Sequence, residues 1–370
     1  MSKKRFLISG GGTGGHVFPA IAIAKALQRR FPDAEFLFAG AKGKIEMSQV
    51  PAAGFPIEGL WISGLERKLS LKNLLFPVKV LHSLWKARRI INRFQPDVII
   101  GVGGYASWAV VWTGNNKGIK TLLQEQNSYA GITNRNLGKK ANTICVAYEN
   151  MERFFPPEKI VLTGNPIRRE VIDIEGKREK AAEYFGLDAN KTTLLFVGGS
   201  LGALAINQSL ENSVHRLLDS GYQVIWQTGS YYYEKAQQKA KVLNRSGLVV
   251  TRFIKAMDLG YAMGDIVVSR AGAMAISELS AIGKPVILVP LPTAAEDHQR
   301  MNALALVRKD AAEMILNKDA VEKLIPAVIR LAEDKGKQEL LSRNIKKLGI
   351  KDADERIAGE VEKLLNSAND

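Results

Sequence analysis

The sequence predicts an α/β protein made of two doubly wound domains, and two observations carry that prediction. Short apolar strands alternate with helical segments through the first half of the chain, pause in a turn-rich and charged segment at 164–180, and then resume. Glycine-rich turns follow three of the strands, at 10–15, 101–104 and 198–202. Such alternation is typical of parallel sheets covered on both faces, which bind ligands at the carboxyl ends of their strands.

We expect the elements of each domain in the following order. The first domain has strands at 6–9, 35–39, 97–101, 121–124 and 143–146, and a helix from about residue 17 to residue 30 follows the first of them. The second has strands at 192–198, 223–228, 248–251, 266–269 and 286–290, with a helix after Ala203.

The predicted domains span 1–163 and 164–350. In the remaining segment, 351–370, apolar residues at Ile357, Val361 and Leu364 have helical spacing. This helix can cap either domain, and we expect it to pack on the first. Two Rossmann-like domains that face each other across a ligand-binding cleft form the GT-B architecture, which is the fold we predict.

The composition restricts the partners of the chain. Its 370 residues include 52 Lys and Arg against 37 Asp and Glu, a formal charge of +15, which indicates an anionic partner such as nucleic acid, a phosphorylated ligand or acidic lipid. The single cysteine, Cys145, excludes an internal disulfide and suits a reducing compartment. We expect no secretory signal, no membrane-spanning run and no metal-ligand cluster.

The positive charge is concentrated in the segment 67–93, which contains eight Lys or Arg and no Asp or Glu. Apolar residues recur there at helical spacing. Two interpretations remain open: a crossover helix that buries this stripe in the core, or an apolar surface ringed by cations that binds anionic lipid. In the second interpretation the membrane contacts are Leu74, Leu75, Leu81 and Trp85.

Three nucleotide-binding classes do not fit. Gly10, Gly12 and Gly15 satisfy the dinucleotide fingerprint, but no acidic residue ends the second strand to bind a ribose. A phosphate loop of the Walker type would need Gly-Lys-Ser/Thr after the glycines, which is absent. A nucleic-acid surface would interleave its basic residues with aromatics, whereas the basic run here is interleaved mainly with aliphatic residues.

The first glycine turn is a candidate cradle for a diphosphate, because residues without Cβ let main-chain amides approach an anion at the start of a helix. His16 in this turn is our first candidate general base, with Glu125 as the second; His16 can instead orient a phosphate or cap the helix. The turn after the strand at 266–269 can also hold a phosphate, and Glu278 can accept ribose hydroxyls or act as a surface carboxylate. His82 and His215 fall in predicted helices and are expected to be structural.

Taken together, the motifs resemble those of the MurG family, the N-acetylglucosamine transferases that convert lipid I to lipid II in bacterial peptidoglycan synthesis. The resemblance runs along essentially the whole chain. It depends on ordered motifs at 11–19, 103–105, 125–127 with 131–134, 164–168, 198–203, 270–278 and 299–303.

The resemblance implies a GT-B enzyme with an acceptor-binding, membrane-facing first domain and a second domain that binds the UDP-sugar. The acceptor diphosphate would then be held by Gly12, Gly103, Gly104 and Tyr105. The donor UDP-GlcNAc would be held by Thr13, Gly14, Gly15, Asn127, Arg168, Ser200, Ile254, Ala273, Met274, Ala275, Ile276, Ser277, Glu278 and Gln299. Gln124 and His298 depart from the pattern of some members and are left unassigned.

The implied reaction transfers GlcNAc, with inversion, to the C4 hydroxyl of a muramyl sugar on undecaprenyl diphosphate, at the cytoplasmic face of the bacterial membrane. We expect it to need no cofactor and no metal, since no strand ends in a paired Asp-x-Asp, and we expect no nucleic-acid partner. The alternatives are another GT-B transferase with a lipid-linked acceptor, or a noncatalytic module that binds nucleotide sugars.

Overall fold

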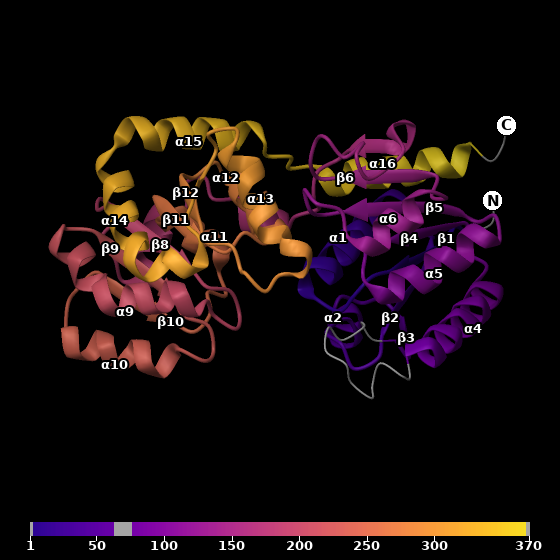
Figure 1. The fold of residues 1–370 in the computed structure, drawn as a ribbon, viewed down its shortest axis with the longest axis horizontal. Helices are drawn as coiled ribbons and strands as arrows, with labels where there is room; N and C mark the ends of the chain where they lie inside the picture. The colour runs from indigo at the N-terminus through magenta and orange to yellow at the C-terminus, as the bar shows by residue number, and fades with distance from the viewer. Residues whose placement is uncertain (1–2, 63–75, 368–370) are drawn as a thin grey trace. The chain divides into compact units, whose positions relative to one another are not determined.

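The computed structural model describes residues 3–62 and 76–367, and the chain forms two compact units (Figure 1). One unit comprises Met1–Ile167 with Lys351–Asp370, and the other is Arg168–Ile350. Each unit contains one parallel sheet with helices on both faces. The predicted α/β class with two doubly wound domains is therefore confirmed.

The first unit contains a seven-stranded sheet in the order β3-β2-β1-β4-β5-β6-β7, with every neighbouring pair parallel. The winding reverses between β1 and β4, and ligands of open α/β sheets bind outside the strand ends at such a point. The strands are β1 Arg5–Ser9, β2 Glu35–Ala41, β3 Ile57–Leu60, β4 Val98–Gly101, β5 Lys120–Glu125, β6 Thr143–Val146 and β7 Ile160–Leu162.

Two apolar cores cover the faces of this sheet. Phe6 and Ile8 of β1 pack with helices α1 (Gly14–Arg30), α2 (Glu46–Ala52) and α16 (Ala353–Asn366). Leu7, between them, packs on the opposite face with α4 (Phe76–Phe94), α5 (Tyr105–Asn116) and α6 (Ile132–Gly138). Since neighbouring strand residues point to opposite faces, a continuous apolar strand serves both cores.

The second unit repeats the plan with a six-stranded parallel sheet in the order β10-β9-β8-β11-β12-β13. Its switch point lies between β8 and β11. The strands are β8 Thr193–Val197, β9 Gln223–Gln227, β10 Leu248–Thr251, β11 Ile266–Ser269, β12 Val286–Leu288 and β13 Glu313–Met314.

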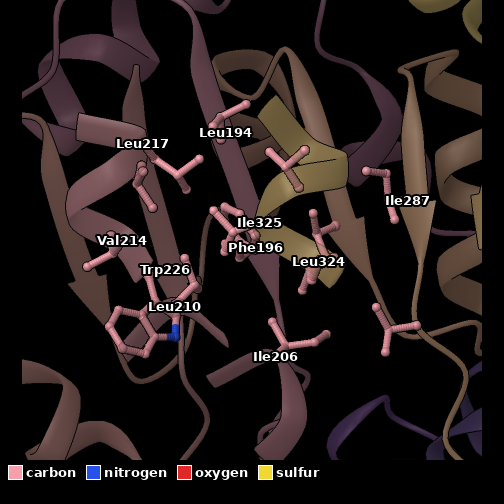
Figure 2. Close-up of a cluster of buried hydrophobic side chains, with 14 of the residues drawn as sticks. Leu194, Phe196, Ile206, Leu210, Val214, Leu217, Trp226, Ile287, Leu324 and Ile325 are labelled. Atoms are coloured by element: carbon pink, nitrogen blue, oxygen red, sulfur yellow. The ribbon is translucent and has the colours of Figure 1, made fainter. Parts of the chain in front are cut away.

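One face of this second sheet is covered by α9 (Leu204–Asp219) and α14 (Ala320–Glu333), whose apolar residues meet Leu194 and Phe196 of β8 (Figure 2). Trp226 is fully buried there, and its indole N–H donates to Asn207 at 2.9 Å, which satisfies the polar atom of a core tryptophan. The other helices of the unit are α7 Arg169–Ile172, α8 Arg178–Phe185, α10 Tyr233–Leu243, α11 Met257–Met263, α12 Ala273–Ile282, α13 His298–Val307 and α15 Lys335–Lys347.

The structure differs from the predicted elements at strand edges and at one helix start. Strands β3, β7 and β13 were not predicted, because they are only two to four residues long and partly exposed, so their apolar pattern is weak. Helix α1 begins at Gly14 and not near residue 17, with Thr13 as the residue before its first turn. The glycines of the first turn thus enter the helix.

The C-terminal helix α16 is part of the first unit's core, because its Ile357 is fully buried with α1 residues. We predict that Ile357→Ala lowers the free energy of unfolding by about 2–5 kcal/mol, the usual cost of truncating a core side chain. Urea unfolding followed by circular dichroism measures it. Arg356→Ala on the exposed side of the same helix is the control, and an equal effect of both changes would contradict the packing.

Candidate active site

The first glycine turn connects β1 to α1 and is partly exposed to solvent. Gly12 and Thr13 are exposed, and Gly12 has a φ of +90°, which favours glycine. The first turn of α1 carries no acidic side chain, and Thr13 makes no side-chain cap to it. The helix start therefore keeps its positive end available for an anion.

His16 lies where this turn meets the second glycine turn, which follows β4. Its Nδ1 lies 3.2 Å from the Gly11 carbonyl oxygen and 3.2 Å from the Thr13 hydroxyl. Gly103 has a φ of +95°, and a Cβ there would lie 2.9 Å from His16 Nε2, so only glycine fits beside the ring. A Cβ on Gly104 would lie 2.6 Å from the Gly11 carbonyl oxygen. The structure thus brings together His16 and both glycine turns at the β1/β4 switch point.

Glu125 ends β5 and is 2% exposed. Its carboxylate accepts hydrogen bonds from the main chain of Asn127 (3.1 Å) and Gly131 (3.1 Å), and from the side chain of Asn134 (2.9 Å). Burial raises the pKa of Glu125, although these hydrogen bonds oppose the rise. The arrangement holds the loop between β5 and α6, and the Asn127 side chain also donates to this carboxylate.

Tyr105, the remaining predicted diphosphate residue, opens α5 and is 46% exposed.

In the second unit, Glu278 of α12 is the centre of a polar cluster. Its side chain accepts a hydrogen bond from the Tyr261 hydroxyl at 3.1 Å and faces Arg168 Nη2 at 3.4 Å. Burial raises the pKa of Glu278, while the charge of Arg168 lowers it. Burial also raises the pKa of Tyr261, with the Glu278 charge adding to it. Arg168 and Glu278, which were each predicted to bind the donor, are therefore neighbours in the structure.

The remaining predicted donor residues of this unit lie in the segments that follow its strands, whereas Thr13, Gly14, Gly15 and Asn127 belong to the first unit. Ser200 is exposed in the glycine turn after β8, and its carbonyl accepts the Ser230 amide at 3.2 Å. Ile254 is buried at 3% exposure in the loop after β10. Ala273, Met274, Ala275, Ile276 and Ser277 form the first turns of α12, which has no acidic residue in its first turn.

Gln299 lies near the start of α13, and its Oε1 accepts the Leu291 amide at 2.9 Å. The same loop is held by Arg270, which donates to the carbonyl oxygens of Val289 at 3.0 Å and Pro290 at 3.3 Å. Burial lowers the pKa of Arg270 to about 10. Arg270 thus holds the loop whose Leu291 amide donates to Gln299.

The sequence analysis missed two polar residues, Glu46 under the first glycine turn and Tyr261 beside Glu278. It also missed that Arg270 binds the loop after β12. Glu46 stands in a mixed polar and apolar segment and Tyr261 in a mainly apolar one, so no local pattern marks either residue. Among the described residues, no group of three or more His, Cys, Asp and Glu side chains is arranged to hold a metal ion.

The basic segment is described from Phe76 onward, so Leu74 and Leu75 lie outside the described residues. Helix α4 buries Ala87, Ile90 and Ile91, whereas Leu81 is 68% and Trp85 is 59% exposed. The face of α4 that packs on the core is therefore not the face that carries Leu81 and Trp85.

Aromatic rings form a row beside this exposed face. The His82 ring lies 5.6 Å from the Trp61 ring and 5.9 Å from the Trp85 ring. Lys79 and Arg89 stack over Trp61 and Trp85 respectively, at 5.9 and 5.8 Å. In the part of the chain that the structure describes, no helix is long and apolar enough to cross a membrane.

Comparisons with known proteins agree with this organisation. Residues 6–146 match the glycosyltransferase family 28 N-terminal domain, and residues 193–357 match the family's C-terminal domain. A Cytophaga hutchinsonii protein named UDP-N-acetylglucosamine--N-acetylmuramyl-(pentapeptide) pyrophosphoryl-undecaprenol N-acetylglucosamine transferase is 53% identical, over 98% of this chain and 97% of that protein. A protein of the same name from Parabacteroides distasonis is 50% identical over 99% of this chain and 100% of its own length.

Solved structures agree as well. The crystal structure of Acinetobacter baumannii MurG has a TM-score of 0.79 at 26% identity, covering 97% of this chain and 99% of that one. The glycotransferase of kitacinnamycin, at 15% identity and a TM-score of 0.74 over 99% of this chain and 100% of that one, shares the fold. The chain therefore belongs to glycosyltransferase family 28 and, within it, to the MurG family of UDP-N-acetylglucosamine--N-acetylmuramyl-(pentapeptide) pyrophosphoryl-undecaprenol N-acetylglucosamine transferases.

Proposed function

We propose that this protein transfers N-acetylglucosamine from UDP-GlcNAc to the C4 hydroxyl of the muramyl sugar in undecaprenyl-diphosphate-linked MurNAc-pentapeptide, converting lipid I to lipid II. The observation that carries the proposal is the family match along the whole chain. Two features of the structure agree with it: the polar cluster of Glu278, Tyr261 and Arg168, and the position of His16 between two glycine turns. In this scheme the second unit binds the UDP-sugar, and the first unit binds the acceptor and supplies the base.

The chemistry follows from the groups present. A single in-line displacement inverts the anomeric carbon, so the attacking hydroxyl must lose its proton as the bond forms. His16 accepts that proton, because imidazole titrates near neutral pH and this ring lies between the two glycine turns. Glu125 is buried and accepts four hydrogen bonds from the loop that follows β5 and from α6, which suits a carboxylate that shapes the acceptor site.

The leaving UDP carries negative charge that the protein has to stabilise. We assign this role to the main-chain amides at the start of α12 and to Arg168, which together place positive charge beside the Glu278 cluster. The proposed reaction is metal-independent.

His16→Ala should lower kcat by about 10²–10⁴-fold, the usual contribution of a general base, while the dissociation constant for UDP stays within about twofold. Turnover with a short-chain lipid I analogue and calorimetry with UDP measure the two quantities. His215→Ala, at an exposed position of α9, is the matched control. Loss of UDP binding with unchanged turnover at saturation would contradict the assignment.

Glu278→Ala should weaken UDP binding by more than about tenfold, since ribose hydroxyls in a buried site would lose their acceptor, at about 1–3 kcal/mol. Tyr261→Phe removes only the donor to Glu278 and should have a smaller effect. Isothermal calorimetry with UDP measures the dissociation constant of each variant. An unchanged dissociation constant for Glu278→Ala would reject the donor site.

We also propose that the protein works as a peripheral enzyme at the cytoplasmic face of the membrane, where its lipid-linked acceptor lies. The first unit carries 26 Lys and Arg against 16 Asp and Glu, which concentrates the positive charge of the chain there. Helix α4 carries Lys79 and Arg89 as well as the exposed Leu81 and Trp85. Apolar side chains combined with cations are expected of a surface that inserts into anionic lipid.

Replacing Leu81 and Trp85 together by Ser should reduce binding to anionic vesicles several-fold without loss of stability, because both side chains are exposed. The remaining binding should fall as salt is raised, since cations supply it. Vesicle co-sedimentation measures both effects. The matched control replaces Tyr231 and Val242, which are 85% and 78% exposed in the second unit. Equal binding by the two double variants would place the membrane surface elsewhere, for which the stacked rings of Trp108 and Trp112 on α5 are the next candidate.

A further inference from the structure

A buried carboxylate lies directly under the first glycine turn. Glu46, the first residue of α2, is fully buried. Its Oε2 accepts the main-chain amide of Gly12 at 2.9 Å, and its Oε1 accepts that of Ala41, at the end of β2, at 2.9 Å. The side chain therefore ties the glycine turn to the neighbouring strand.

Two glycines make room for this side chain. A Cβ on Gly11 would overlap the Glu46 carboxylate, and a Cβ on Gly40 would overlap its Cγ. A buried carboxylate is costly unless it is hydrogen-bonded, and here two main-chain amides bind it. The surroundings of the glycine turn are thus built to accommodate a negative charge at this point.

The Gly12 amide and the Gly11 carbonyl belong to the same peptide group. The amide donates to Glu46, and the carbonyl oxygen lies 3.2 Å from Nδ1 of His16. A carbonyl can only accept, so this contact requires a proton on Nδ1 and leaves the lone pair of the neutral ring on Nε2. The Thr13 hydroxyl, also 3.2 Å from Nδ1, can accept or donate and therefore fits either tautomer.

We propose that Glu46 is a positioning residue that acts on His16 through this single peptide group. The negative carboxylate polarises the peptide, which strengthens the carbonyl as an acceptor for Nδ1–H. That fixes the ring orientation and the Nδ1–H tautomer, and it stabilises the imidazolium that forms when Nε2 takes a proton. A carboxylate that orients a catalytic histidine acts by the same logic in hydrolases, there by direct contact. The consequence for turnover rests on the proposed function, whereas the effect on the His16 ring does not.

The first test needs no substitution of Glu46. Imidazole ¹⁵N chemical shifts distinguish the two neutral tautomers, and the chain has only four histidines, so comparison with His16→Ala assigns the signal. We expect His16 of the full-length protein to be in the Nδ1–H form above its titration midpoint. A dominant Nε2–H form would overturn the proposal even if every Glu46 variant failed to fold.

The second test uses Glu46→Gln, which keeps the shape and one carbonyl acceptor but removes the charge and one of the two acceptor oxygens. We expect a mixture of His16 tautomers, a lower midpoint of the His16 titration, and kcat reduced roughly tenfold or more with little change in donor KM. Asp265→Asn is the matched control, because Asp265 also accepts a main-chain amide, that of Thr193 at 2.8 Å, but belongs to the other unit.

The outcomes separate the two hypotheses. An altered tautomer and midpoint with unchanged turnover would support the role of Glu46 and contradict His16 as the base. A His16 spectrum and midpoint in Glu46→Gln equal to those of Asp265→Asn would overturn the role of Glu46, whatever the effect on turnover.

Discussion

The first unit depends on the close approach of two glycine turns at the end of β1 and β4. The His16 ring fills the space that a side chain on Gly103 would need, and main-chain atoms of Gly11 fill the space that a side chain on Gly104 would need. Both turns hold positive φ angles, at Gly12 and Gly103. A side chain on Gly103 would collide with the His16 ring, and one on Gly104 would push the second turn away from the first.

In the second unit the polar cluster is centred on α12, the helix that follows β11, and its chemistry is different. There the buried group is Glu278, which is held by a tyrosine hydroxyl and lies near the more exposed guanidinium of Arg168. Removing a carboxylate from water is costly, so the neighbours of Glu278 must supply the hydrogen bonds and charge that solvent would provide. In the proposed donor site, a ligand with paired hydroxyls would use the remaining acceptor capacity of the same carboxylate, which the Tyr261 hydroxyl already joins to α11.

Helix α4 shows how one amphipathic pattern can serve two purposes. Small and branched residues, Ala87, Ile90 and Ile91, face the sheet, while Leu81 and Trp85 face solvent beside an aromatic row. Neighbouring exposed apolar side chains flanked by cations are the feature on which the proposed membrane contact depends. The basic excess of the whole first unit points the same way.

By itself, the sequence determined the two-domain α/β fold, most of the central strands, and the pairing of glycine turns with strand ends, because these follow from local apolar patterns and the absence of Cβ atoms. It also singled out His16 and Glu278 as candidate site residues. Only the tertiary structure decided that Glu46 reaches Gly12, that Tyr261 binds Glu278, and which face of α4 is buried. Each of these depends on contacts between segments distant along the chain, for which residue spacing carries no signal.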